Sequence, residues 1–373
     1  MGCGSSSQVE DVAPSTKQEQ AAAPEAAHEH KEANDVDVHL NSPPPIEATT
    51  MDEVNTPAYT LTRLLLLGAA ESGKTTLLEQ IRLLYKHNYT EMEFVHRKSF
   101  IYNNILTSIR KLIIRMQDTE TPFENPDNIQ YADKIMNEED CQYACFTADV
   151  YDAIQRVWHD QAVQKIYERR SEINLNDSSK YFLENLASIN KLDYTPTPRD
   201  LIMSYVPTVG VQNVIFSADD HVFQLFDIGG QRIDRRKWAT MYDGISAIFF
   251  CIAISEYDQK MDDDPEMNRL QDALALLEKI SNEPKFQHTP LLLFLNEMDV
   301  FQEKLPLLPL GDHWPDYKGD SEEEALKFIE GLVHKATSGR DPSLLQVYRT
   351  CMIDTDAMKK ILEKAFHAIL KAT

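Results

Sequence analysis

The sequence has 373 residues, of which 42% are hydrophobic, and a formal net charge of −23 at pH 7. This length and apolar content are enough for two domains of ordinary size, each with a core of its own. The negative charge argues against nucleic-acid binding, because phosphate backbones are bound by clustered Lys and Arg. The sequence contains no run of about 18 apolar residues, so we expect no membrane-spanning helix. Five scattered cysteines are typical of a reducing compartment.

The N-terminus reads MGCGSS, which fits the pattern for myristoylation of Gly2, and Cys3 beside it is a candidate for palmitoylation. A plain flexible Gly/Ser terminus is the alternative. Two acyl chains anchor a protein stably, whereas one does so only marginally. Residues 1–58 carry eleven Asp and Glu against two Lys. We therefore expect a mostly disordered acidic tether that is held at a membrane by lipid alone.

Residues 59–89 combine an apolar strand, a glycine-rich turn and a helical pattern. The turn reads GAAESGKTT at 68–76 and matches the P-loop pattern completely, with Gly68 and Gly73 as its two required glycines. In such a loop the backbone N–H groups and Lys74 hold phosphates, and the Thr75 hydroxyl can ligate Mg²⁺. This segment therefore predicts a nucleotide phosphate site.

Residues 90–194 show helical periodicity and no convincing strand, which predicts an all-helical insert domain. Strand patterns return in residues 195–373, at 221–227, 246–255, 290–296 and 346–353, each but the first running into a helical pattern. The predicted fold class is α/β, with a doubly wound parallel sheet that binds its ligand at the carboxyl ends of the strands.

Two further motifs follow predicted strands. The first, DIGGQ at 227–231, offers Asp227 to hold a metal through water, Gly230 for a close backbone approach to the γ-phosphate, and Gln231 to orient an attacking water. The second, NEMD at 296–299, ends in Asp299, whose carboxylate can accept two guanine N–H groups that adenine does not offer. Alone, the second motif would be an ordinary turn. Together with the P-loop it favours GTP over ATP.

With these motifs, about residues 60–373 resemble the α subunits of heterotrimeric G proteins. Similar stretches include LNDSSKYFLENL at 175–186, VPTVG at 206–210, FLNEMD at 294–299 and TCMIDT at 350–355. The resemblance implies a Ras-like GTPase domain, at 59–89 and 195–373, interrupted by the helical domain. It implies GDP or GTP between the two, catalysis by Gln231, and Mg²⁺ held by Thr75 and Thr208, with Asp227 acting through water. The implied nucleotide contacts are Gly68, Glu71, Ser72, Gly73, Lys74, Thr75, Thr76, Ser178, Ile202, Met203, Thr208, Asp227, Gly230, Gln231, Asn296, Glu297, Met298, Asp299, Cys351 and Met352.

The resemblance also implies lipidated Gly2 and Cys3 at the cytoplasmic face of the plasma membrane, and a βγ dimer and a G-protein-coupled receptor as partners. The sequence names no effector. The acidic tether stands where the family has a basic helix that docks on βγ, and the last helix ends before the family's receptor-recognition tail. We expect βγ contact through residues 232–238 to remain possible, and receptor coupling of the usual kind to be an open question.

Two substitutions bear on hydrolysis. Tyr205 stands three residues before Thr208, where the family has its catalytic arginine, and a neutral phenol cannot stabilise charge on the γ-phosphate. Ala70 replaces a glycine, and its methyl group is expected to crowd the catalytic glutamine. Both changes predict slow GTP hydrolysis despite Gln231.

Two more substitutions bear on nucleotide retention. Glu297 replaces a lysine that in the family pairs with an aspartate of the insert, here Asp177. Two facing carboxylates predict a looser contact between the domains and faster GDP release. Met352 replaces a small residue and is expected to add bulk beside the guanine.

We therefore expect a membrane-anchored guanine-nucleotide switch with slow hydrolysis. One alternative is a non-catalytic interaction module that signals by nucleotide occupancy or exchange, which a turnover assay distinguishes. An ATP-using P-loop enzyme is disfavoured by Asn296 and Asp299.

Overall fold

The computed structural model describes residues 61–86, 89–139, 145–208 and 210–372. The predicted acidic tether and both lipidation sites, Gly2 and Cys3, lie outside these ranges. The strands are β1 (Leu61–Gly68), β2 (Val211–Ala218), β3 (His221–Ile228), β4 (Ala247–Ala253), β5 (Leu291–Asn296) and β6 (Leu345–Arg349). The helices are α1 (Lys74–Ile81), α2 (Glu91–Asp118), α3 (Asn128–Met136), α4 (Ala148–Trp158), α5 (Gln161–Glu168), α6 (Ser179–Glu184), α7 (Leu186–Ile189), α8 (Pro198–Met203), α9 (Arg269–Ser281), α10 (Met298–Lys304), α11 (Leu310–His313), α12 (Glu322–Ala336) and α13 (Thr355–Ala372).

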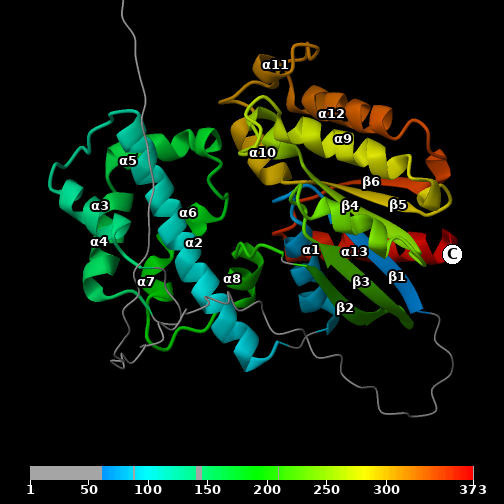
Figure 1. Ribbon diagram of the computed structural model, residues 1–373, viewed down its shortest axis with the longest axis horizontal. Helices are drawn as coiled ribbons and strands as arrows, with labels where there is room; N and C mark the ends of the chain where they lie inside the picture. The colour runs from blue at the N-terminus through cyan, green and yellow to red at the C-terminus, as the bar shows by residue number, and fades with distance from the viewer. Residues whose placement is uncertain (1–60, 87–88, 140–144, 209, 373) are drawn as a thin grey trace, which may run out of the picture. The chain divides into compact units, whose positions relative to one another are not determined.

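The six strands form one sheet in the order β2-β3-β1-β4-β5-β6 (Figure 1). All neighbours pair in parallel except β2 and β3, which form an antiparallel hairpin. Its two-residue turn, Asp219 and Asp220, has φ angles of 49° and 59°, as expected for a turn whose twist matches that of the strands. The predicted α/β fold is confirmed, and the sheet is parallel apart from this edge strand.

Helices cover both faces of the sheet (Figure 1). Successive strand side chains point to opposite faces, so Leu64 and Leu66 pack with α1 and α13, while Leu65 and Leu67 pack with α9 and α12. Every residue of β4 is buried, as in a strand covered on both sides. These strands, α1 and α8 to α13 are called the sheet domain below.

The helical insert comprises α2 to α7 and contains no strand among its described residues. Its longest helix, α2, begins at a capping box in which Thr90 and Glu93 satisfy each other's backbone N–H groups. Ile101, Ile105 and Ile109 then lie on the face of α2 that packs into the insert's own core. The insert is therefore a second folded body.

The carboxyl ends of the parallel strands bring the chemical motifs to one edge of the sheet. The P-loop follows β1, Asp227 lies next to the end of β3, and Asn296 ends β5. The apolar pattern had predicted a strand at 346–353, but strand β6 ends at Arg349. Residues 350–353 form a loop at this edge.

Candidate functional site

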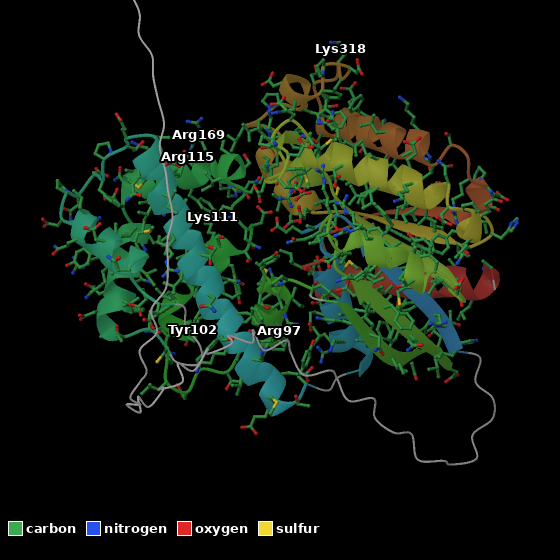
Figure 2. The ribbon with its side chains drawn as sticks, in the orientation of Figure 1. Arg97, Tyr102, Lys111, Arg115, Arg169 and Lys318 are labelled. Atoms are coloured by element: carbon green, nitrogen blue, oxygen red, sulfur yellow. The ribbon has the colours of Figure 1, made fainter. Side chains whose placement is uncertain are left out.

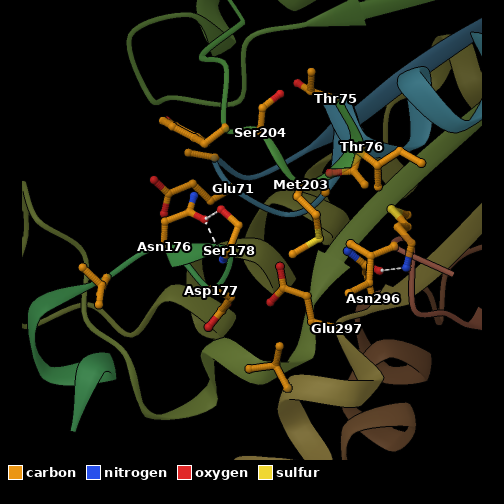
Figure 3. A pocket seen from close by; sticks show the side chains of 18 of the residues that line it. Glu71, Thr75, Thr76, Asn176, Asp177, Ser178, Met203, Ser204, Asn296 and Glu297 are labelled. Carbon is orange, nitrogen blue, oxygen red and sulfur yellow. Dashed lines mark hydrogen bonds between the residues drawn. The ribbon is translucent and has the colours of Figure 1, made fainter. Parts of the chain in front are cut away.

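A cavity of about 610 Å³ lies at this edge, and both the sheet domain and the insert contribute to its wall (Figure 3). Most of the predicted contact residues line it. These are Glu71, Gly73, Lys74, Thr75, Thr76, Ser178, Ile202, Met203, Tyr205, Thr208, Gly230, Gln231, Asn296, Glu297, Asp299 and Met352. Five predicted contact residues do not line the cavity, so they can affect the site only through the residues that do. These are Gly68, Ser72, Asp227, Met298 and Cys351.

The P-loop depends on glycines at two positions. Gly73 has a φ of 92°, and a Cβ added there would lie 2.2 Å from Asn296 Nδ2. Gly68 has a φ of 147°, and its Cβ would lie 2.4 Å from the Cys251 carbonyl oxygen. Side chains at either position would be strained and would collide with the neighbouring strand ends. The loop can therefore lie tightly against β4 and β5.

Lys74 is buried at the base of the loop, with 5% of its surface exposed. Its Nζ donates a hydrogen bond to the Ala69 carbonyl at 2.5 Å, which curls the side chain back over the loop. Burial lowers the pKa of Lys74, and the nearby Asp227 carboxylate opposes this shift. A cation is thus held where phosphate oxygens would approach the loop.

Three oxygen-bearing side chains meet beside Lys74. The hydroxyls of Thr75 and Thr208 lie 2.9 Å apart, and Thr208 donates to Asp227 Oδ2 at 3.2 Å. Asp227 is fully buried, and burial raises its pKa to about 6 although Lys74 opposes the shift. Its Oδ1 has no hydrogen-bond partner among the described residues. Hydroxyl and carboxylate oxygens with spare capacity are a donor set that fits Mg²⁺.

At the other end of the cavity, Asn296 connects two loops. Its Oδ1 accepts from the Met352 backbone N–H at 3.0 Å and from Thr350 Oγ1 at 3.3 Å. Its Nδ2 contacts the Ser72 carbonyl oxygen of the P-loop at 3.4 Å. The side chain that the sequence assigned to guanine recognition therefore also fixes the distance between the phosphate loop and the base-facing loop.

Asp299 is exposed on the cavity wall at the start of α10. Behind it, the Cys351 thiol is half-buried, and burial followed by the charge and hydrogen bond of Asp299 raises the pKa of that thiol to about 12. The thiol is therefore neutral at physiological pH and can act as a donor that orients the Asp299 carboxylate.

The side chain of Met352 lies between the hydrophobic core and the P-loop. It is 2% exposed and belongs to the hydrophobic cluster between the sheet, α1 and α13. Its sulfur would lie 2.9 Å from a Cβ added at Gly73, and its backbone oxygen accepts from Gln80 Nε2 at 2.8 Å. Because Met352 also lines the cavity, the expectation of added bulk beside the base stays a prediction.

Tyr205 is positioned by the insert. Its backbone N–H donates to Asn104 Oδ1 at 2.9 Å, and its carbonyl accepts from Asn104 Nδ2 at 3.1 Å, so α2 holds this peptide from both sides. Burial, and then the charge and hydrogen bond of Glu71, raise the pKa of Tyr205 to about 12. The phenol is thus neutral where the family has a cation.

A cation that the sequence did not point out lies nearby. Arg269, at the start of α9 and 7% exposed, pairs with Glu71 at 2.7 Å and with Glu256 at 2.6 Å. Its Nη2 also lies 3.5 Å from the carbonyl oxygen of Ala70. In the sequence, only the position of Arg269 shortly after the acidic stretch 262–266 could have indicated a role for it. Both carboxylates hold this guanidinium against the outside of the P-loop.

Glu297 and Asp177 occupy the cavity wall from different domains (Figure 3). Glu297 accepts a hydrogen bond from Ser255 Oγ within the sheet domain. Burial and then the charge of Asp177 raise the pKa of Glu297 well above its usual range. Burial raises the pKa of Asp177 to about 6, and Lys304 and Arg170 oppose that shift. The charge of one carboxylate therefore affects the pKa of the other across the cavity.

Comparison with known proteins agrees with the site. The family model for the G-protein alpha subunit matches residues 41–369. The chain belongs to the G-protein alpha subunit family. It is 54% identical over 313 residues to the guanine nucleotide-binding protein alpha-13 subunit of Caenorhabditis elegans, covering 84% of this chain and 90% of that protein. The counterpart from Caenorhabditis briggsae is also 54% identical, over 85% of this chain and 93% of its own.

A more distant relative is the guanine nucleotide-binding protein subunit alpha of Emericella nidulans, 35% identical over 80% of this chain and 85% of its own. As a member of the family, this G-protein alpha subunit is a guanine-nucleotide-binding signal transducer and a GTPase. Among its described helices, none is both long and apolar enough to cross a bilayer.

The position of Met352 in the core gives a first testable prediction. Met352→Ala should lower the free energy of unfolding by about 2–5 kcal/mol, because it removes a buried side chain. The preference for guanine nucleotides should remain, because Asn296 and Asp299 are unchanged. Chemical denaturation measures the stability, and competition between GDP and ADP measures the preference. Leu307→Ala, at a 66% exposed residue, is the control; unchanged stability of Met352→Ala would contradict the structural role of this buried side chain.

The two wall carboxylates predict a pH dependence. In the closed cleft both pKa values are raised, that of Asp177 to about 6, so the closed state binds these protons more tightly than the open state. It therefore loses stability as the pH rises through the raised pKa of Asp177. GDP release should therefore be slower at pH 5.5 than at pH 7.5, as measured with a fluorescent GDP analogue. The groups facing the two carboxylates are Arg170, Glu256, Asp299, Glu303 and Lys304.

The control for this pH effect is the double variant Asp177→Asn, Glu297→Gln, which should flatten the profile. A profile of unchanged steepness in that variant would assign the pH dependence to other groups.

Proposed function

We propose that this G-protein alpha subunit is a membrane-anchored guanine-nucleotide switch with slow intrinsic GTP hydrolysis. The observation that carries the proposal is the neutral Tyr205 at the position of the catalytic arginine, with its backbone fixed by Asn104. The nearby Arg269 is already paired with two carboxylates. Neither the neutral Tyr205 nor the paired Arg269 therefore offers a mobile guanidinium to the negative charge that develops on the γ-phosphate.

The other roles follow the motifs. Lys74 and the loop N–H groups hold the phosphates. Thr75 and Thr208 hold Mg²⁺, with Asp227 acting through water, and the bound cation offsets phosphate charge. Gln231 orients the attacking water. Because Gly230 has no side chain, its backbone can lie close to the loop: a Cβ there would be 2.5 Å from Lys74 Nζ.

At the base end, Asn296 and Asp299 select guanine by the hydrogen bonds that only guanine satisfies. The buried Asn296 keeps the loop at 350–353 in place, and the exposed Asp299 faces the cavity. Both roles are supported by the contacts of these side chains with the loops on either side.

Lipid at Gly2 and Cys3 would anchor the chain at the cytoplasmic face of the plasma membrane. The family's partners, a βγ dimer and a G-protein-coupled receptor, are proposed for this chain too. The segment 232–238 is the proposed contact for βγ, and its Ile233 is 65% exposed. The net charge of −23 supports no nucleic-acid role.

The hydrolysis proposal is tested by Tyr205→Arg. Restoring a guanidinium beside the phosphates should raise the single-turnover rate of GTP hydrolysis by about tenfold or more. Tyr205→Phe is the matched control and should leave the rate low. A wild-type rate that does not change on introducing the arginine would contradict the proposed role of position 205.

The position of Ala70 can be tested in the same assay. Ala70→Gly should add to the effect of Tyr205→Arg, because it removes the methyl group near the glutamine. If the double variant is no faster than Tyr205→Arg alone, then Ala70 does not limit hydrolysis.

Nucleotide choice is tested by competition. GTP should displace a bound fluorescent GDP analogue, and ATP should fail to do so at a roughly 10²-fold higher concentration. Asp299→Ala should weaken GTP binding and reduce this selectivity. Equal competition by ATP would overturn the assignment of the motif at 296–299 as the guanine reader.

A further inference from the structure

A nucleotide between two domains can leave only when the walls of its cavity separate. Both linkers join the insert to the sheet domain near the beginning of α2 and near α8 (Figure 1). There, Arg97 of α2, labelled in Figure 2, pairs with the buried Glu79 of α1 and donates to Ser204 Oγ at 3.2 Å. This end of the cleft is a fixed hinge, so opening requires contacts farther from the linkers to break.

Away from the hinge, one ion pair between described residues crosses the cleft. Arg170, in the short 3-10 helix η2 (Arg170–Ile173) of the insert, places Nη2 2.8 Å from Glu303 Oε1 on α10. Nearby, Asn174 Nδ2 donates to the Lys260 carbonyl at 3.3 Å. Glu297 takes no part in bridging the domains, because its carboxylate is bound to Ser255 in its own domain.

Arg170 is held in place before it meets Glu303. It is 7% exposed, its guanidinium carbon lies 4.9 Å from the centre of the Tyr167 ring, and its Nε lies 3.8 Å from Asp177 Oδ1. Glu303, by contrast, has a side chain that is 60% exposed. A preordered guanidinium loses little further side-chain entropy when it pairs with Glu303.

The pair is also coupled to recognition of the base. Glu303 stands four residues after Asp299 on α10, so both side chains lie on one face of that helix. Moving α10 away from the insert therefore moves Glu303 off Arg170 and shifts Asp299 relative to the insert wall. Breaking the ion pair and loosening the base pocket are parts of one movement.

We infer that the Arg170–Glu303 ion pair is the latch that sets the rate of guanine-nucleotide release, with the cation on the insert and the anion on the sheet domain. The polarity of this pair is the reverse of the contact that the family resemblance implies between residue 297 and Asp177. This inference rests on the proposed nucleotide site, but not on the rate of hydrolysis.

The test measures release of a fluorescent GDP analogue from the full-length chain in excess GDP. Arg170→Glu and Glu303→Arg should each speed release about five- to thirtyfold, the range that a loss of one or two kcal/mol produces. The double variant Arg170→Glu, Glu303→Arg should return to within about threefold of wild type, because the pair is restored in reverse. Arg169→Glu is the matched control and should change nothing: Arg169, labelled in Figure 2, is exposed and pairs with Glu172 inside the insert.

Glu303→Arg keeps the test decisive if Arg170→Glu perturbs the insert, because the Glu303 side chain is exposed. Release at the wild-type rate in Glu303→Arg, or a charge-swapped double variant as fast as either single one, would overturn the latch. Fast single-turnover hydrolysis by the wild-type protein would overturn the proposed slow GTPase and leave the latch standing.

Discussion

The side chain of Asn296 is the contact on which the nucleotide site depends most. Its buried amide accepts a hydrogen bond from the loop after β6 and contacts the P-loop after β1. More than 270 residues of the sequence separate these two loops. Gly73 makes the approach possible by leaving no Cβ between them. The sheet holds only the first residue of each loop, through the pairing of Gly68 with Cys251 and the hydrogen bond from the Thr350 N–H to the Leu295 carbonyl. The amide therefore turns separate strand ends into one surface.

The electrostatics of the cleft differ between its two ends. The phosphate end has the buried Lys74 and the loop N–H groups, as any P-loop requires. The rest of the cavity is lined by carboxylates from both domains, and the cations Arg170, Lys180 and Arg199 in this lining each have a partner, Glu303, Glu184 and the Ile353 carbonyl. A bound nucleotide is thus attracted at its phosphates, while retention at the base relies on shape, hydrogen bonds and the contacts between domains.

The sequence predicted the fold class and the meeting of the motifs at one edge of the sheet, because apolar runs and glycine spacing are local signals. It missed β2, whose alternating VQNVIFSA pattern identifies a half-buried edge strand, and hence the antiparallel hairpin. It also missed Arg170, Arg269 and Asn104. Each acts through a partner far away in the chain, and no local pattern distinguishes such a residue from an ordinary charged or polar helix residue. The burial of Met352 likewise involves residues of other elements, such as Gln80, which donates to its backbone oxygen.

The double hydrogen bond between Asn104 and the Tyr205 peptide has a mechanical consequence. It attaches the segment before Thr208 to a helix of the insert, and not only to the sheet that carries the phosphate loop. When the insert swings outward, α2 pulls on this segment and can draw the Thr208 hydroxyl away from Thr75 and Asp227. A single displacement then both opens the cleft and separates the side chains of the cation site. A subunit that is exchanging its nucleotide is therefore poorly arranged to hydrolyse it.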